Sequence, residues 1–101
     1  MKIINTPELQ DWQKQNKKFR IIDVRTEQEY NAGHIEDSEL IPLDIFESKF
    51  VDKLPDKAET IVCVCRSGNR SGIAVNFLDG NGYKSVYNLV GGYTIYRLFA
   101  L

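Results

Sequence analysis

The sequence is poor in the features that mark several classes of protein. Its 101 residues include two cysteines, three prolines, one histidine and one tryptophan. No stretch approaches the roughly 20 consecutive apolar residues that a membrane-spanning helix needs, and residues 1–20 lack the apolar segment of a secretory signal. We therefore expect a cytoplasmic location and no membrane partner.

An excess of charge of one sign is also missing. Thirteen Lys and Arg face fourteen Asp and Glu, which leaves a formal net charge of −1, and the two signs are interleaved along the chain. Nucleic-acid-binding domains commonly carry a basic patch, so we expect no nucleic-acid partner. Hydrophobic residues make up 43% of the chain, which suits a globular protein. The length fits one domain spanning residues 1–101.

The two cysteines, Cys63 and Cys65, lie two residues apart within an apolar segment. On a strand their side chains would point to the same face, without the geometry that a disulfide requires. We expect free thiols in a reducing compartment. We predict neither a metal nor a cofactor.

Short β-branched segments alternate with helical patterns along the chain. The predicted strands are residues 2–4, 19–24, 39–42, 60–64 and 84–89, and the predicted helices are 6–15, 26–32, 43–50, 71–80 and 93–101. Thr6 is expected to cap the first helix, and Thr26 with Glu29 forms a predicted capping box. This alternation predicts an α/β fold: a small, mostly parallel sheet of about five strands with helices on both faces.

The stretch CVCRSGNRSG, residues 63–72, begins at the C-terminal end of the most apolar predicted strand. Sites in open α/β sheets form beyond the carboxyl ends of strands, and Cys65 lies at such an end. The positive end of the next helix, together with Arg66 and Arg70, would favour the thiolate over the thiol. Gly68 allows the backbone to approach a bound anion closely. We therefore predict that Cys65 is a nucleophile.

Three segments together resemble the rhodanese-like sulfurtransferase domain, in the order that the family has them. They are IIDVRTEQEYNAGHI (21–35), IVCVCRSGNRSGIAVNFL (61–78) and GYKSVYNLVGGY (82–93). The resemblance implies an enzyme of the thiosulfate sulfurtransferase type, in which Cys65 accepts a sulfane sulfur as a persulfide. It would pass this sulfur to cyanide, a thiol or a protein, by nucleophilic catalysis in two half-reactions.

The resemblance also implies which residues bind the substrate. Backbone amides of the loop would surround the persulfide sulfur, and its two arginines would attract a small anionic donor such as thiosulfate. The substrate-binding residues predicted in this way are Arg66, Ser67, Gly68, Asn69, Arg70 and Ser71.

Four more residues are predicted to support the loop. The resemblance suggests that Asp23, Arg25 and Glu29 form a buried or half-buried ion pair. We expect His34 to have a structural role, because a thiolate already stabilised by amides needs no general base. Cys63 is predicted to belong to the core.

Two other functions remain open. The protein can instead be a persulfide carrier or docking module for one partner protein. A cysteine phosphatase or arsenate reductase is less favoured, because only four residues separate Cys65 from Arg70, and the corresponding loop of those phosphatases is one residue longer.

Overall fold

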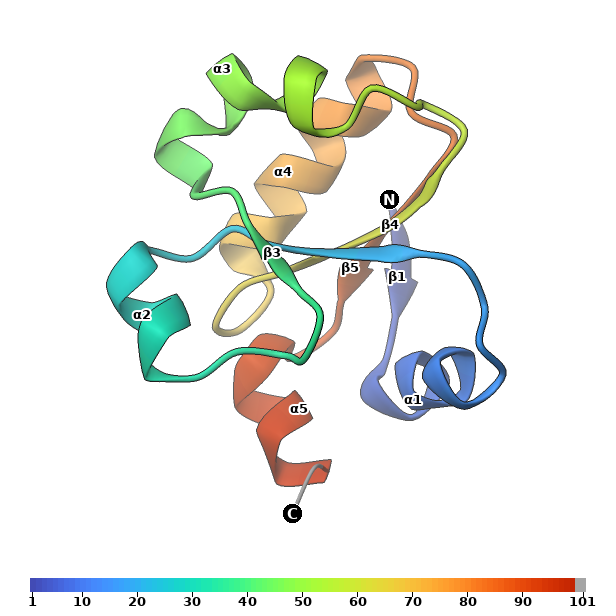
Figure 1. Cartoon of the computed structure of the whole chain (residues 1–101), viewed down its shortest axis with the longest axis vertical. Coiled ribbons are helices and arrows are strands. Elements are labelled where there is room, and N and C mark those ends of the chain that lie inside the picture. The colour runs from blue at the N-terminus through green and yellow to red at the C-terminus, as the bar shows by residue number, and fades with distance from the viewer. Residues whose placement is uncertain (100–101) are drawn as a thin grey trace.

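The computed structural model describes residues 1–99, which form a parallel five-stranded sheet in the order β1-β5-β4-β2-β3 (Figure 1). The strands are β1 (Lys2–Ile4), β2 (Arg20–Asp23), β3 (Glu39–Leu40), β4 (Thr60–Val64) and β5 (Ser85–Leu89). The helices are α1 (Thr6–Lys14), α2 (Glu27–Ala32), α3 (Leu43–Lys53), α4 (Asn69–Gly80) and α5 (Gly92–Phe99). The predicted fold class is confirmed.

Helices cover both faces of the sheet, as Figure 1 shows for α3 and α4 on one side and α1 and α5 on the other. The central strand β4 contributes to both cores. Ile61 and Cys63 pack in the cluster that contains Phe46 of α3, whereas Val62 packs in the cluster that contains Leu9 of α1. Because successive side chains of a strand point to opposite faces, burial on both sides accounts for the unbroken apolar run of this strand.

The first helix begins differently from the sequence prediction. Asn5, and not Thr6, is the N-cap, because its side chain accepts a hydrogen bond from the Glu8 amide at 2.9 Å. The Glu8 carboxylate in turn accepts from the Asn5 amide at 3.0 Å, which completes a capping box. Thr6 lies inside the helix and is buried.

The starts of α2 and α4 compare differently with the sequence prediction. The capping box predicted for α2 is confirmed, since Thr26 Oγ1 accepts from the Glu29 amide at 3.2 Å and the Glu29 carboxylate accepts from the Thr26 amide at 3.0 Å. Helix α4 begins at Asn69, two residues before Ser71, because Gly68 at φ 113° turns the chain directly into it. Residues 100–101 of the final predicted helix lie outside the described residues.

None of the helices within residues 1–99 combines the length and apolar character needed to cross a lipid bilayer.

Replacing Asn5 with Ala should lower the free energy of unfolding by about 1 kcal/mol, because the first turn of α1 loses its side-chain cap. Urea denaturation followed by circular dichroism measures this change. Asn76→Ala is the matched control, since Asn76 is exposed within α4 and caps nothing. It should stay within about 0.5 kcal/mol of wild type. Equal effects of the two substitutions would contradict the capping role of Asn5.

Candidate active site

Cys65 follows β4 directly, in the loop that leads to α4. The residue is only 1% exposed, yet its sulfur meets polar groups of the loop. Sγ accepts a hydrogen bond from the Gly68 amide at 2.9 Å, and the Ser71 hydroxyl lies 3.3 Å from it. The loop therefore bends over the sulfur and directs hydrogen-bond donors toward it.

These surroundings change the pKa of the Cys65 thiol in two opposing directions. Burial raises the pKa, whereas hydrogen bonds from the Ser71 hydroxyl and from the amides of Ser71, Gly68 and Ser67 lower it. The hydrogen bonds prevail, so the pKa falls below its ordinary value of 9.0. The arginines, the helix and the loop amides were all expected to favour the thiolate, and the contributions that lower the pKa in the structure are those hydrogen bonds from the loop and from Ser71.

The second cysteine occupies a different environment. Cys63 is fully buried in the core cluster of α3 and α4, as predicted. Burial, with smaller contributions from Asp79 and Cys65, raises the pKa of its thiol to about 12. Both cysteines are free thiols, and Cys63 stays protonated at neutral pH.

The two arginines of the loop differ in their contacts. Arg70 pairs with Glu29 of α2 through two hydrogen bonds, at 2.7 Å and 2.9 Å. The Arg66 side chain is 75% exposed and approaches Glu29 only to 4.0 Å. Arg70 is thus held against α2, while Arg66 extends into solvent beside the loop.

A second ion pair lies at the carboxyl end of β2. The guanidinium of Arg25 donates to the carboxylate of Asp23 at 2.7 to 3.0 Å, and both residues are buried. Arg25 also donates to the Gly33 carbonyl at 2.7 Å, and its guanidinium lies 4.5 Å from the centre of the Tyr93 ring. The prediction placed Asp23, Arg25 and Glu29 together, whereas the structure pairs Glu29 with Arg70 instead.

His34 is exposed and lies at the end of α2. Its ring stacks on Tyr30 with 3.7 Å between the ring centres, and its Nδ1 lies 2.8 Å from the Tyr30 carbonyl oxygen. These contacts belong to α2 and not to the cysteine loop. A structural role for His34 stays our interpretation.

The N-terminus of α5 holds the loop from outside. The Tyr93 amide donates to the Cys65 carbonyl at 2.8 Å, and the Thr94 amide donates to the Arg66 carbonyl at 3.1 Å. Gly92 makes this approach possible, because a Cβ at this position would lie 2.5 Å from both carbonyl oxygens. Its φ of 59° also favours glycine.

Asn88 of β5 is a site residue that the sequence analysis missed. Its Nδ2 donates to the Gly68 carbonyl at 3.0 Å, and its Oδ1 lies 2.5 Å from the Ser71 hydroxyl. The available signal was a polar residue two positions after Val86, on the face of β5 that is otherwise apolar. Alternation along a strand places both on the side covered by α4.

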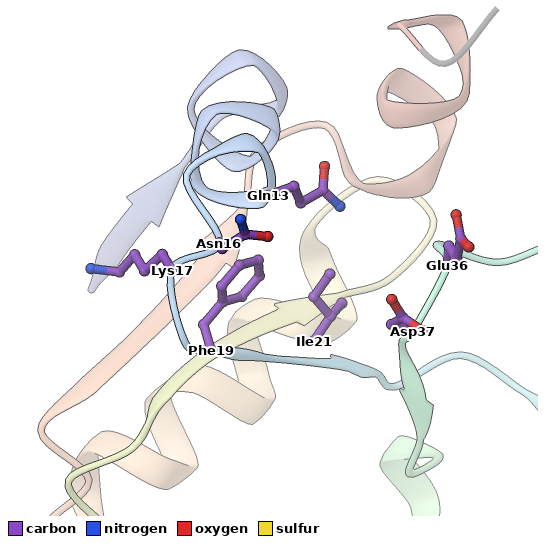
Figure 2. Close-up of a pocket in the computed structure, with 7 residues that line it drawn as sticks. All are labelled: Gln13, Asn16, Lys17, Phe19, Ile21, Glu36 and Asp37. Carbon is purple, nitrogen blue, oxygen red and sulfur yellow. The ribbon is translucent and has the colours of Figure 1, made fainter.

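Two surface hollows differ in whether a residue of the cysteine loop lines them. One of about 220 Å³ adjoins the loop and is lined by Arg25, Glu29, Ala32, Gly33, Arg66, Tyr93, Thr94 and Arg97. Figure 2 shows another, of about 300 Å³, lined by Gln13, Asn16, Lys17, Phe19, Ile21, Glu36 and Asp37. The second includes no residue of the loop 65–71, so we assign it no part in the site. Residues 1–99 contain no group of three or more His, Cys, Asp or Glu side chains suited to a metal ion.

Replacing Glu29 with Gln should weaken the fold at neutral pH more than in acid. Hydrogen bonds from the Arg70 guanidinium, followed by those from Thr26, outweigh burial and lower the pKa of Glu29 from 4.5 to about 2. A carboxylate with a lowered pKa stabilises the folded chain above about pH 4.5, and this contribution disappears as the pH falls toward 2. We expect a loss of about 1 to 2 kcal/mol at pH 7, since solvent screens the partly exposed pair.

Urea titrations of wild type and Glu29→Gln at pH 7 and at pH 2.5 test this dependence. Gln retains the capping contact of α2, so the difference reports the ion pair. If wild type and Glu29→Gln differ in free energy of unfolding by the same amount at both pH values, the stabilising ion pair between Glu29 and Arg70 is contradicted.

Replacing Gly92 with Ala should destabilise the fold by about 1 to 3 kcal/mol, because the new Cβ meets the Cys65 and Arg66 carbonyls at a strained φ. Thermal unfolding measures the loss, and the rate of Cys65 alkylation by iodoacetamide shows whether the loop has moved. Gly80→Ala is the matched control, since no atom lies within 4 Å of a Cβ there. An equally small effect at both glycines would refute the tight approach of α5.

Comparison with known proteins agrees with this geometry. Residues 5–97 match the family described as the rhodanese-like domain. Over 75 residues the chain is 37% identical to an adenylyltransferase and sulfurtransferase, uba4, from Ogataea parapolymorpha, covering 73% of this chain and 19% of that protein. It is equally identical to a tRNA uridine(34) hydroxylase from Yersinia pestis, covering 70% of this chain and 21% of that protein. The chain therefore spans about a fifth of the length of these relatives.

Solved structures show the same fold. A rhodanese-like domain protein from Staphylococcus aureus superposes with a TM-score of 0.84 at 36% identity, covering 95% of this chain and 91% of that one. A thiosulfate sulfurtransferase from Pseudomonas aeruginosa gives a TM-score of 0.87 at 19% identity, covering 98% of this chain and 19% of that one, which shows a shared fold alone. With the family match over most of its length, the chain belongs to the rhodanese-like domain family.

Proposed function

We propose that this protein is a sulfurtransferase that moves a sulfane sulfur from a small anionic donor such as thiosulfate to a thiophilic acceptor. The observation that carries the proposal is the position of Cys65 Sγ, which accepts a hydrogen bond from the Gly68 amide at 2.9 Å beneath the loop. The lowered pKa of this thiol favours the nucleophilic thiolate. A relative of 37% identity whose name includes sulfurtransferase adds support.

In the first half-reaction the Cys65 thiolate attacks the outer sulfur of thiosulfate. The new bond joins the two sulfur atoms, and the bond within thiosulfate breaks so that sulfite leaves with the electron pair. The persulfide carries a negative charge on its outer sulfur. Amides of Ser67, Gly68 and Ser71 surround that end of the side chain and would stabilise the charge without rearrangement.

In the second half-reaction a nucleophilic acceptor attacks the outer sulfur. Cyanide, a thiol or a protein can play this part, and the Cys65 thiolate leaves as it was before the first step. Arg66 would attract the anionic donor, since its side chain is the more exposed of the two loop arginines. Arg70 would act together with Glu29, to which it is paired.

We further propose a cytoplasmic setting, which keeps both free thiols reduced.

A persulfide carrier that serves one partner protein is the second candidate. It is favoured by the relatives, in which the matching region is about a fifth of a longer protein. Fast transfer to a protein acceptor with negligible turnover of cyanide would support this function over the enzyme. Hydrolysis of an aryl phosphate that depends on Cys65 would instead favour the phosphatase.

Incubation with thiosulfate should add the mass of one sulfur atom to the protein, and cyanide should remove it with release of thiocyanate. Intact-mass spectrometry measures both steps. The adduct should be absent from Cys65→Ser and present in Cys63→Ala, because the Cys63 thiol is buried and protonated. An adduct that persists in Cys65→Ser, or none in wild type, would reject the proposed function.

A further inference from the structure

The orientation of the Asn88 amide follows from its two neighbours. The Gly68 carbonyl can only accept a hydrogen bond, so the group 3.0 Å from it must be the Nδ2 donor. Oδ1 then faces the Ser71 hydroxyl at 2.5 Å. Because Oδ1 can only accept, the hydroxyl must donate to it.

Ser71 has one hydroxyl proton and two possible recipients. Oδ1 of Asn88 lies 2.5 Å away and Cys65 Sγ lies 3.3 Å away. While the proton points to Asn88, the hydroxyl oxygen can only accept from the sulfur, which suits a protonated thiol. The same proton would stabilise a thiolate beyond what the Gly68 amide provides, so ionisation of Cys65 favours a hydroxyl that turns from Asn88 to the sulfur.

We propose that Asn88 is a positioning residue that competes with Cys65 for the Ser71 hydroxyl proton and thereby controls ionisation of the sulfur. When Cys65 is a protonated thiol, hydrogen bonds run from the thiol to Ser71 and from Ser71 to Asn88. In the thiolate, the hydroxyl donates to the sulfur and Oδ1 loses its partner. The inference concerns the residue proposed above as nucleophile, but it requires no sulfur transfer.

The packing of β5 against α4 holds Asn88 in this place. Asn88 is paired in the sheet with Cys63 of β4, which sets its side chain on the face from which Cys65 also departs. A Cβ on Gly72 would lie 3.5 Å from the Asn88 Nδ2. This is an ordinary van der Waals distance, so the amide lies against the first turn of α4.

Charged and titratable groups near the sulfur come from several elements, and the variants below leave them in place. Arg70 on α4 and Cys63 on β4 interact electrostatically with Cys65. Glu29 on α2 and Asp23 at the end of β2 face Arg70, Arg25 pairs with Asp23, and the exposed Arg66 follows Cys65 in the chain. A change in the titration of Cys65 on mutation of Asn88 therefore reports the hydrogen-bond chain and the loop.

The test is a double-mutant cycle read by the pH dependence of Cys65 alkylation with iodoacetamide, quantified by mass spectrometry on the whole chain. Asn88→Ala should lower the apparent pKa of Cys65 by about half to one unit, a three- to tenfold gain in thiolate, because Ser71 can donate to the sulfur without competition. In a Ser71→Ala background the same substitution should not lower the pKa. Cys65→Ser controls for alkylation elsewhere.

Two outcomes of this cycle would overturn the proposal. A pKa that rises in Asn88→Ala, or that shifts equally in both backgrounds, would show that Asn88 acts only through the Gly68 carbonyl and would overturn the proposal. Should Asn88→Ala fail to fold, Asn88→Asp decides, since its carboxylate is a stronger acceptor for the Ser71 proton. Asn88→Asp should raise the pKa of Cys65 more when Ser71 is present than in the Ser71→Ala variant. Equal pKa shifts in the two backgrounds would refute the competition for the Ser71 proton. If the protein transfers no sulfur from thiosulfate, the proposed function is rejected. The titration of Cys65 by alkylation still tests the role of Asn88 in that case.

Discussion

A buried sulfur atom can carry negative charge only where hydrogen-bond donors replace the water that burial removes. In this chain the donors come from the backbone between β4 and α4, and the Gly68 amide is the nearest at 2.9 Å from Cys65 Sγ. The path of the loop that directs them depends on partners of its carbonyl groups. The carbonyls of residues 65 and 66 accept from α5, and the carbonyl of residue 68 accepts from Asn88. The position of the sulfur therefore depends on three elements that are distant in sequence.

The charged residues around the loop mainly join elements to one another. Arg25 and Asp23 neutralise each other in the interior at the end of β2, and the guanidinium reaches the Gly33 carbonyl beyond α2. Glu29 both caps α2 and pairs with Arg70. One carboxylate thus ties the start of α2 to the first turn of α4. Arg66, which has only a distant approach to Glu29, is the loop charge most available to a solute.

Much of this arrangement can be predicted from the sequence, because it depends on local patterns. The apolar run of residues 60–64 matches β4, and Thr26 with Glu29 forms the predicted capping box. Long-range partners were harder to predict. Nothing local to Asn88 indicates that it contacts Gly68 and Ser71, since that contact exists only after β5 pairs with β4. The same holds for the ion pair of Glu29 and Arg70, which lie 41 residues apart. Glycine is needed at position 92 because the carbonyls of residues 65 and 66 pack against it, and this contact too exists only in the folded chain.

The two hydrogen bonds from the start of α5 have a dynamic consequence. The peptide groups after Cys65 and Arg66 cannot rotate without breaking bonds to Tyr93 and Thr94. Fraying of the last helix from its N-terminal end and loosening of the cysteine loop are therefore one cooperative opening event rather than two. We therefore expect amide hydrogens in these two segments to exchange together, and the reactivity of the sulfur to depend on a helix whose contribution to the loop is made through its backbone.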